Sequence, residues 1–224
     1  MHQDAGFDIE ERHLRSGATV VVGIDEVGRG SWAGEVTVGA AVSGSESTSG
    51  LRDSKLLSPA KRVEARDRVL AWSPAVALGH ATPVEIDELG MTAALRVAAT
   101  RAIAQLEQLG FCPEVILLDG KHDYLQLPGV QVETHIKGDM RSQSMAAASI
   151  VAKVWRDAHM AEEAFAYPHY GFESNAGYPA PAHLAGLDEF GLCAIHRQSW
   201  IFAEGRSGRV RWPRHQESIP VPLF

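Results

Sequence analysis

An uninterrupted apolar run near the N-terminus is the strongest hydrophobic pattern in this chain. Residues 19–24 are rich in β-branched side chains, which predicts a buried strand. Asp25 and Glu26 follow that strand at once. Two carboxylates at the end of a buried strand are unfavourable unless cations or hydrogen-bond donors offset their charge. The pattern therefore predicts a basic side chain or a divalent metal ion beside them; in the simpler interpretation, both acids close a solvated turn.

The remaining apolar runs and helical stripes predict an α/β fold. Four more strands are expected, at residues 35–43, 75–80, 115–118 and 130–135. Helices are expected within residues 1–18 and then at 61–71, 84–89, 92–109, 142–165 and 181–190, the first of these five preceded by the N-cap Ser58 and by Pro59. The second strand is close enough in sequence to pair antiparallel with the first. Together the elements predict a five-stranded mixed sheet flanked by helices.

Two of the predicted strands end in an aspartate. Asp25 follows the first strand, and Asp119 follows the strand at 115–118. In open α/β sheets the ligand crevice lies outside the carboxyl ends of the strands, so the two acids converge if their strands are neighbours. A further acid, Asp157, stands in the helix expected at 142–165. Two alternatives stay open, namely that Asp119 belongs to an Asp-Gly turn and that Asp157 is a surface acid paired with Lys153.

The four acids Asp25, Glu26, Asp119 and Asp157 offer oxygen ligands only. Such a set suits Mg²⁺ or Mn²⁺ better than zinc. Two of these ions about 3.5–4 Å apart activate a water and stabilise the leaving oxygen in phosphodiester cleavage. The acids therefore predict metal-dependent phosphodiester chemistry.

Composition narrows the class of protein. With 224 residues, 45% of them hydrophobic, the chain can build one sizeable core. Cys112 and Cys193 are the only cysteines, which excludes a disulfide framework and favours a reducing compartment. No run approaches the ~18 apolar residues of a membrane span and no signal peptide is evident, so a cytoplasmic protein is expected. The net charge of −7 argues only weakly against a nucleic-acid partner, because acids that hold metal ions also count as negative.

The glycine-rich stretch after the first strand matches no common phosphate-binding motif. The spacing of Gly28, Gly30 and Gly34 departs by one residue from a dinucleotide fingerprint, and no Gly-Lys-[Ser/Thr] follows. Motifs of serine hydrolases and zinc proteases are also missing from the sequence. We interpret the glycines beside Arg29 as positions where backbone amides can approach a ligand closely.

Two kinds of aromatic residue have open interpretations. Tyr178 stands between a glycine and a proline, either as a rigid exposed ring that stacks on a sugar or base, or as a loop tyrosine packed under the core. The ten histidines are scattered, and most of them, including His135 and His183, are expected to be solvated or hydrogen-bonded rather than metal ligands.

Eight short blocks occur in the order seen in bacterial ribonuclease HII, and the chain resembles that family over about residues 19–202. Each block alone is modest evidence, but the ordered set is specific. The blocks are Gly23-Ile24-Asp25-Glu26-Val27-Gly28-Arg29-Gly30, Asp53-Ser54-Lys55-Leu56, Leu118-Asp119-Gly120, Lys137-Gly138-Asp139, residues 146–157, Tyr170-Gly171-Phe172, Gly177-Tyr178-Pro179 and His196-Arg197-Gln198-Ser199-Trp200.

The resemblance implies a ribonuclease H-like fold and an endoribonuclease that leaves 5′-phosphate ends. It implies hydrolysis of the RNA strand of RNA–DNA hybrids and nicking 5′ of single ribonucleotides in duplex DNA, as in ribonucleotide removal during replication and repair. It further implies a monomer with a two-ion Mn²⁺ or Mg²⁺ site. The implied metal-binding, catalytic acids are Asp25, Glu26, Asp119 and Asp157, and the implied substrate contacts are Gly28, Arg29, Gly30, Ser54, Lys55 and Tyr178.

The chain departs from the common family pattern at a few positions. Ala176 stands where many relatives have lysine, and Ser31, Trp32 and Glu35 replace the usual residues of the glycine loop. The metal site is unaffected, whereas phosphate contacts are placed in question. The arginines of the tail around Trp212 could compensate, although an unstructured solubilising tail is the simpler interpretation.

The predicted organisation is an N-terminal extension (1–18), a catalytic domain with a C-terminal helical part (19–202) and a flexible tail (203–224). Two other functions compete with the ribonuclease. One is a DNA-acting relative of the same fold, such as a resolvase or strand transferase, against which the glycine–arginine loop and Tyr178 argue. The other is an inactive hybrid-binding module, which would require the loss of a carboxylate.

Overall fold

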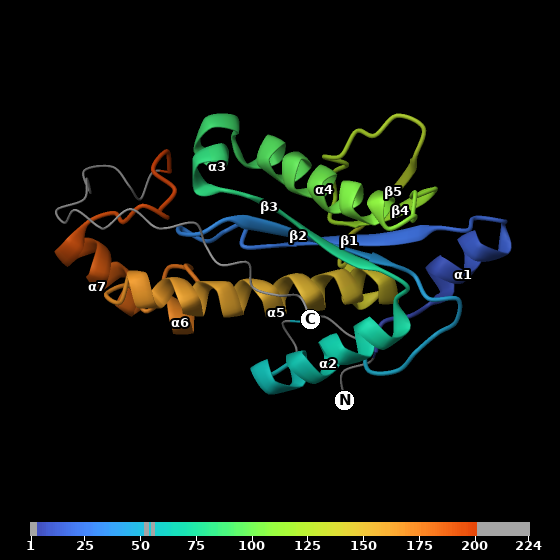
Figure 1. The fold of residues 1–224 in the computed structure, drawn as a ribbon, viewed down its shortest axis with the longest axis horizontal. Helices are drawn as coiled ribbons and strands as arrows, with labels where there is room; N and C mark the ends of the chain where they lie inside the picture. Colours follow the sequence, from blue (N-terminus) through green and yellow to red (C-terminus); the bar gives the residue numbers. More distant parts are fainter. Residues whose placement is uncertain (1–3, 52–53, 55–56, 201–224) are drawn as a thin grey trace. The chain divides into compact units, whose positions relative to one another are not determined.

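The computed structural model describes residues 4–51, 54 and 57–200, and Figure 1 shows the order of its helices and strands. The strands are β1 (Val21–Val27), β2 (Val36–Val42), β3 (Val76–Ala81), β4 (Val115–Asp119) and β5 (Gln131–His135). The helices are α1 (Asp8–Arg15), α2 (Pro59–Trp72), α3 (Pro83–Leu89), α4 (Met91–Gln108), the short 3₁₀ helix η2 (Gly138–Met140), α5 (Gln143–Ala166), α6 (Phe172–Asn175) and α7 (Pro181–Phe190).

The chain divides into two compact units. Unit 1 contains the residues up to 27, residues 37–80 and residues 95–154, and unit 2 contains residues 28–36, 81–94 and the residues from 155 onward. Unit 1 therefore holds nearly all of the sheet, while unit 2 holds the glycine loop and the last two helices.

The five strands form one mixed sheet in the order β3-β2-β1-β4-β5. β1 pairs antiparallel with β2 and parallel with β4, and β4 pairs parallel with β5. The predicted fold class is confirmed. The predicted strands and helices are all present, with ends that differ by a few residues, whereas η2 and α6 were not predicted.

Helices pack closely on both faces of the sheet in unit 1, with α4 on one face and α5 on the other (Figure 1). Gly23 and Gly39 let the strands approach α5, since a Cβ at either position would collide with the backbone of that helix. Gly79 plays the same part for α4. These glycines are needed for close approach, because a side chain there would push the helix away from the sheet.

The N-terminal helix α1 is an integral part of unit 1. Ile9 packs into a core cluster with residues of β1, β4 and α5. Glu10 is fully buried, and its Oε1 accepts hydrogen bonds from the backbone N–H of Ser144 at 2.8 Å and from the hydroxyl of Ser142 at 2.5 Å. A carboxylate at a helix N-terminus satisfies unpaired N–H groups and interacts favourably with the helix dipole. α1 thus caps the first turn of α5.

Unit 2 has a core of its own. Its buried members are Ala33, Met160, Tyr167, Tyr170, Phe172, Ala176, Leu187 and Cys193. α3 is tied to the segment after α7 because the carboxylate of Asp87 accepts the backbone N–H groups of Gln198 and Ser199. Among the described residues, no helix combines the length and the hydropathy that a membrane span requires.

Several predictions stay untested. The division at residues 18 and 202, the monomeric state and the cytoplasmic location remain predictions. The tail at 203–224, with its arginines around Trp212, lies outside the described residues.

Candidate active site

Asp25 and Asp119 lie side by side at the carboxyl ends of two parallel strands. The register pairs Ile24 with Leu118, which places the next residue of each strand at the same edge of the sheet. Together with Asp139 they form a group whose carboxylate oxygens lie within 4.8 Å of one another. The predicted convergence of Asp25 and Asp119 therefore occurs, and a third acid joins them.

The environment of Asp25 disfavours its charge. Only 3% of the residue is exposed. Burial raises the pKa of Asp25 well above its usual value, and the neighbouring charges of Asp119 and Glu26 act in the same direction. A hydrogen bond with Ser149 on α5 opposes this effect. A buried acid beside other acids is a common feature of sites that bind cations.

Asp139 is the member of this group that was not predicted from the sequence as a candidate ligand. β5 runs parallel to β4 and pairs His135 with Asp119, so the turn after β5 starts beside that acid. Lys137 adopts a left-handed conformation (φ 56°), and Asp139 follows in η2 with 3% exposure. The signal was the one used for Asp25 and Asp119, an acid after a parallel strand, but Asp139 lies four positions beyond the last residue of its strand, His135.

Gly138 fixes the spacing between Asp139 and Asp119. Its backbone N–H donates to Oδ1 of Asp119 at 2.6 Å. A Cβ on Gly138 would collide with the sulfur of Met145 and lie 3.2 Å from the same carboxylate oxygen. The bond orients Asp119, because one of its two oxygens is held by the turn that carries Asp139.

Glu26 and Asp157 are not members of this group. Glu26 is half-buried at the next position of β1, and its backbone N–H donates to Oδ1 of Asp25 at 2.8 Å. Asp157 is half-buried on α5, in unit 2. Among the described residues, the one group of three or more potential ligands consists of Asp25, Asp119 and Asp139. The roles of Glu26 and Asp157 as ligands stay predictions.

Two arginines, Arg156 and Arg197, are fully buried in unit 2 and hold the glycine loop at 28–36. The guanidinium of Arg197 donates to the carbonyl oxygens of Gly28 at 2.6 Å, Arg29 at 2.8 Å and Gly34 at 3.1 Å. Burial lowers the pKa of Arg197 to about 9, which leaves it charged at neutral pH. The planar, multiply donating guanidinium can hold several carbonyl groups at once, which an ammonium cannot.

Arg156 binds the other side of the same loop. It donates to the hydroxyl of Ser31 at 2.7 Å, and to the carbonyls of Ala33 at 3.0 Å and Ala176 at 2.7 Å. Ser31 in turn donates to the carbonyl of Gly28 at 3.0 Å. Two departures from the family pattern, Ser31 and Ala176, thus take part in the scaffold of the loop. Ala176 does so through its backbone, in a left-handed conformation (φ 49°).

Gly28 and Tyr178 meet in this scaffold. Gly28 has φ +84°, and a Cβ there would also collide with the side chain of Arg156, so only glycine fits. Its backbone N–H donates to the hydroxyl of Tyr178 at 3.2 Å. Tyr178 is half-buried, whereas Arg29 and Gly30 are exposed. The predicted substrate contacts Gly28, Arg29, Gly30 and Tyr178 therefore lie together in unit 2, with Gly28 buried and Arg29 and Gly30 exposed.

The other predicted substrate contacts are Ser54 and Lys55. Ser54 is buried in unit 1, and its hydroxyl lies 3.0 Å from that of Ser149, the residue bonded to Asp25. Its side chain is thus directed to α5, and its role with substrate stays a prediction. Lys55 lies outside the described residues.

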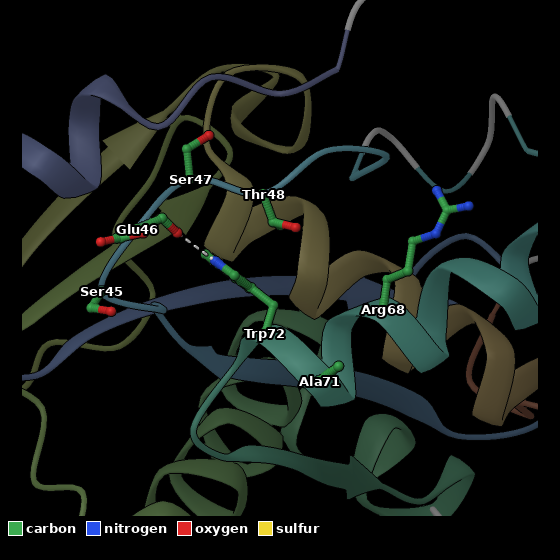
Figure 2. A pocket seen from close by; sticks show the side chains of 7 residues that line it. All are labelled: Ser45, Glu46, Ser47, Thr48, Arg68, Ala71 and Trp72. Carbon is green, nitrogen blue, oxygen red and sulfur yellow. Dashed lines mark hydrogen bonds between the residues drawn. The ribbon is translucent and has the colours of Figure 1, made fainter.

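An open hollow of about 390 Å³ in unit 1 contains none of these residues. It is lined by the loop 45–48 and by the last turns of α2, including Arg68 and Trp72 (Figure 2). The indole N–H of Trp72 donates to the carbonyl of Glu46 at 2.7 Å. The carboxylate of Glu46 and the C-terminal end of α2 disfavour a phosphate there. We therefore assign the chemistry to the acids and not to this hollow.

The sequence of this chain is similar to those of known proteins. A family model described as Ribonuclease HII matches residues 22–203. The ribonuclease HII of Streptomyces avermitilis is 51% identical over 197 residues, which cover 87% of this chain and 83% of that protein. The enzyme of Streptomyces griseus subsp. griseus is 52% identical over 200 residues, with the same coverage of 87% and 83%.

The fold has a counterpart among solved structures. The ribonuclease H2 from Pyrococcus horikoshii OT3 superposes with a TM-score of 0.70 at 27% identity, covering 83% of this chain and 96% of that one. The residues matched by the family model, 22–203, include Asp25 and Asp119. This chain therefore belongs to the ribonuclease HII family of ribonuclease H endonucleases.

Proposed function

We propose that this chain hydrolyses the RNA strand of RNA–DNA hybrids and nicks duplex DNA on the 5′ side of a single embedded ribonucleotide. The products are a 5′-phosphate and a 3′-hydroxyl end. The observation that carries the proposal is the group of three carboxylates within 4.8 Å at the carboxyl ends of β4 and β1 and in η2. Family membership supplies the reaction class.

The acids fit a divalent-metal centre. All the donors are carboxylate oxygens, which suits Mg²⁺ or Mn²⁺. A cation would also offset the burial and the mutual repulsion that raise the pKa of Asp25. We propose that Asp25, Asp119 and Asp139, with Glu26, hold two such ions. When bound, they would supply a nucleophilic water and stabilisation of the leaving 3′ oxygen.

The residues of the chain have distinct parts in this reaction. Asp25 is oriented by Ser149 and by the N–H of Glu26, and Asp119 is oriented by Gly138. These hydrogen bonds keep the carboxylates in place before substrate arrives, so little reorganisation is needed at the moment of cleavage. The acids themselves contribute no positive charge, so the affinity for nucleic acid must come from other residues.

Recognition of ribose is proposed for the surface of unit 2. Gly28, Arg29 and Gly30 would contact the 2′-hydroxyl, the group that distinguishes RNA from DNA. Tyr178 would stack on the sugar at the RNA–DNA junction. The support is the exposure of Arg29 and Gly30 and the bond between Gly28 and the hydroxyl of Tyr178. The proposed roles of Ser54 and Lys55 near the substrate backbone rest on the resemblance alone.

The experiment that tests the function uses a labelled DNA duplex with one ribonucleotide beside an all-DNA duplex. Each is incubated with Mn²⁺, Mg²⁺ or EDTA. We expect one metal-dependent nick 5′ of the ribonucleotide and no cleavage of the control duplex. Equal cleavage of both duplexes would favour the DNA-acting alternative, and binding without any nick would favour the inactive module.

A second experiment decides between Asp139 and Asp157 as the fourth acid. Asparagine is placed at each position, and the same change at Asp67, an exposed acid on α2, serves as the control. Loss of metal-dependent cleavage and of metal-induced thermal stabilisation in Asp139→Asn, but not in Asp157→Asn, would assign the fourth ligand to Asp139. The reverse result would support the prediction made from sequence.

A further inference from the structure

Next to Tyr178, unit 2 contains a pair of hydrogen-bonded histidines that the proposed chemistry does not use. His183 lies in the first turn of α7 and His196 follows that helix, with exposures of 0% and 1%. Their Nε2 atoms lie 2.9 Å apart. Nδ1 of His183 lies 3.0 Å from the carbonyl oxygen of Tyr178, and Nδ1 of His196 accepts the backbone N–H of Cys193 at 2.9 Å.

The hydrogen-bond donors of Cys193, at one end of this series, determine which nitrogen of each histidine carries the proton. Nδ1 of His196 faces the N–H of Cys193, so it carries no proton itself. The thiol of Cys193 lies 3.0 Å from the same nitrogen, and burial raises its pKa to about 12, so it too remains a donor. The proton of neutral His196 is therefore on Nε2, which donates to Nε2 of His183. His183 must then carry its proton on Nδ1, which donates to the carbonyl of Tyr178.

The surroundings favour neutral rings. Tyr170 and Phe172 present their rings edge-on to His183, with centroids 6.1 Å and 5.2 Å away. Tyr170 also lies against His196, at 4.9 Å between centroids. Burial among these rings lowers the pKa of His183, and lowers that of His196 to about 3. If both rings are neutral, one proton lies between the two Nε2 atoms. If His183 were an imidazolium, its Nε2–H would face the Nε2–H of His196.

This series ends on the backbone carbonyl of Tyr178. The following residue is Pro179, so the peptide between them has no N–H and its carbonyl is the only polar group. The N–H of Tyr178 donates to the carbonyl of Asn175 at 2.9 Å, and its hydroxyl accepts from Gly28. Fixing the carbonyl as well leaves the ring little freedom to rotate away from the glycine loop.

We propose that His183 and His196 are positioning residues for substrate recognition, which hold Tyr178 through a one-way series of hydrogen bonds from Cys193. The proposal rests on the function proposed above, because it takes Tyr178 as the residue that contacts the substrate sugar. It assigns a task to two buried histidines that neither the metal site nor the glycine loop requires. It also makes a statement about proton positions that can be tested without substrate.

The first test is NMR spectroscopy of the wild-type protein with ¹⁵N-labelled histidine at neutral pH. Long-range ¹H–¹⁵N correlations distinguish the two neutral tautomers from each other and from the imidazolium. We expect His183 protonated on Nδ1 only and His196 on Nε2 only. The opposite tautomer in either ring, or a charged ring, would overturn the proposal even if the protein cleaves its substrate normally.

The second test separates positioning from simple structural support. In His183→Asn the amide nitrogen can replace Nδ1 and still donate to Tyr178, whereas in His183→Gln the amide replaces Nε2 and reaches His196 instead. Both changes disturb the buried pair. We expect His183→Gln to raise KM for the single-ribonucleotide duplex about tenfold with kcat little changed, as for one lost hydrogen bond. We expect His183→Asn to retain most of the wild-type affinity.

A double-mutant cycle with Tyr178→Ala completes the test. If His183 acts through the tyrosine, His183→Gln has little further effect on KM once the ring is removed. Equal effects of His183→Gln in both backgrounds, or equal losses in the asparagine and glutamine variants, would refute the proposal. A wild-type protein that does not nick at all would instead refute the proposed function, with the tautomer result still standing on its own.

Discussion

Replacing Asp25 by asparagine should stabilise the metal-free protein while it abolishes cleavage. The acid is buried, and one of its carboxylate oxygens lies within 4.8 Å of a carboxylate oxygen of Asp119 and of Asp139. Without a cation, every ionised pair in this group opposes folding. Asparagine keeps the shape of the side chain and its hydrogen-bonding capacity but carries no charge, so the variant removes the repulsion and little else.

The size of the effect follows from the spacing. Two unit charges 4.8 Å apart repel by about 3.5 kcal/mol at an effective dielectric constant of about 20. Because Asp25 takes up a proton more readily in the folded state, part of this penalty is already relieved. We therefore expect the free energy of unfolding to rise by about 2 kcal/mol, or Tm by roughly 4–8 °C for a chain of this size.

Thermal unfolding in EDTA and in Mn²⁺ tests this reasoning. In EDTA the variant should unfold at the higher temperature. In Mn²⁺ the wild type should gain about 2.7 kcal/mol at a hundredfold excess over its Kd, whereas the variant gains much less, so the order of stabilities approaches equality or reverses. Asp67→Asn, on the exposed face of α2, should change neither value by more than about 0.5 kcal/mol.

The pH dependence gives the sign of the effect. The pKa of Asp25 is higher in the folded than in the unfolded chain, so the wild type loses stability as the pH rises above the unfolded value. The advantage of Asp25→Asn should widen over that range and then level off above the folded pKa. An advantage that is absent in EDTA, or that shrinks as the pH rises, would show that the acids do not repel one another as described.

Three further results are expected. Gly39→Ala should lower the free energy of unfolding by about 1–3 kcal/mol in urea titrations, because the new methyl group collides with the backbone of α5 at Ala148. Arg197→Lys should retain metal-dependent stabilisation but lose discrimination between ribose and deoxyribose in paired cleavage assays, since an ammonium cannot span three carbonyl groups. Glu10→Gln should lower stability by about 1 kcal/mol in thermal unfolding at low salt, because the first turn of α5 loses its buried charge.

The sheet and two of the acids could be predicted because their signals are local. A β-branched run followed at once by Asp25, and an apolar run followed at once by Asp119, place both acids at strand ends before any pairing is known. Parallel pairing of β1 and β4 then brings them together. Asp139 was not predicted as a member of the acidic group because its position depends on the left-handed conformation of Lys137 and on the turn of η2. Hydrophobic periodicity describes neither of these features.

Contacts between distant parts of the chain could not be predicted. Glu10 resembles any charged residue of an amphipathic helix, yet it is fully buried against Ser144, 134 residues later. His183 is expected from the sequence to be solvated or hydrogen-bonded rather than a metal ligand, and the structure shows it buried, with hydrogen bonds to the carbonyl of Tyr178 and to His196. The sequence contains no local sign of the two partners of His183, because these contacts depend on how loops of unit 2 pack.

The buried arginines explain how a chain with a net charge of −7 can present donors to nucleic acid. In a trans peptide the carbonyl of one residue and the N–H of the next point in opposite directions. Arg197 draws the carbonyls of Gly28 and Arg29 inward, and thereby directs the N–H groups of Arg29 and Gly30 toward the surface, where both residues are exposed. In the proposed function, these adjacent backbone groups would contact a phosphate or a 2′-hydroxyl group, and the buried guanidinium of Arg197 would contribute positive potential there. If the loop contacts the substrate as proposed, a count of exposed lysines and arginines underestimates its capacity to bind a phosphate or a 2′-hydroxyl group.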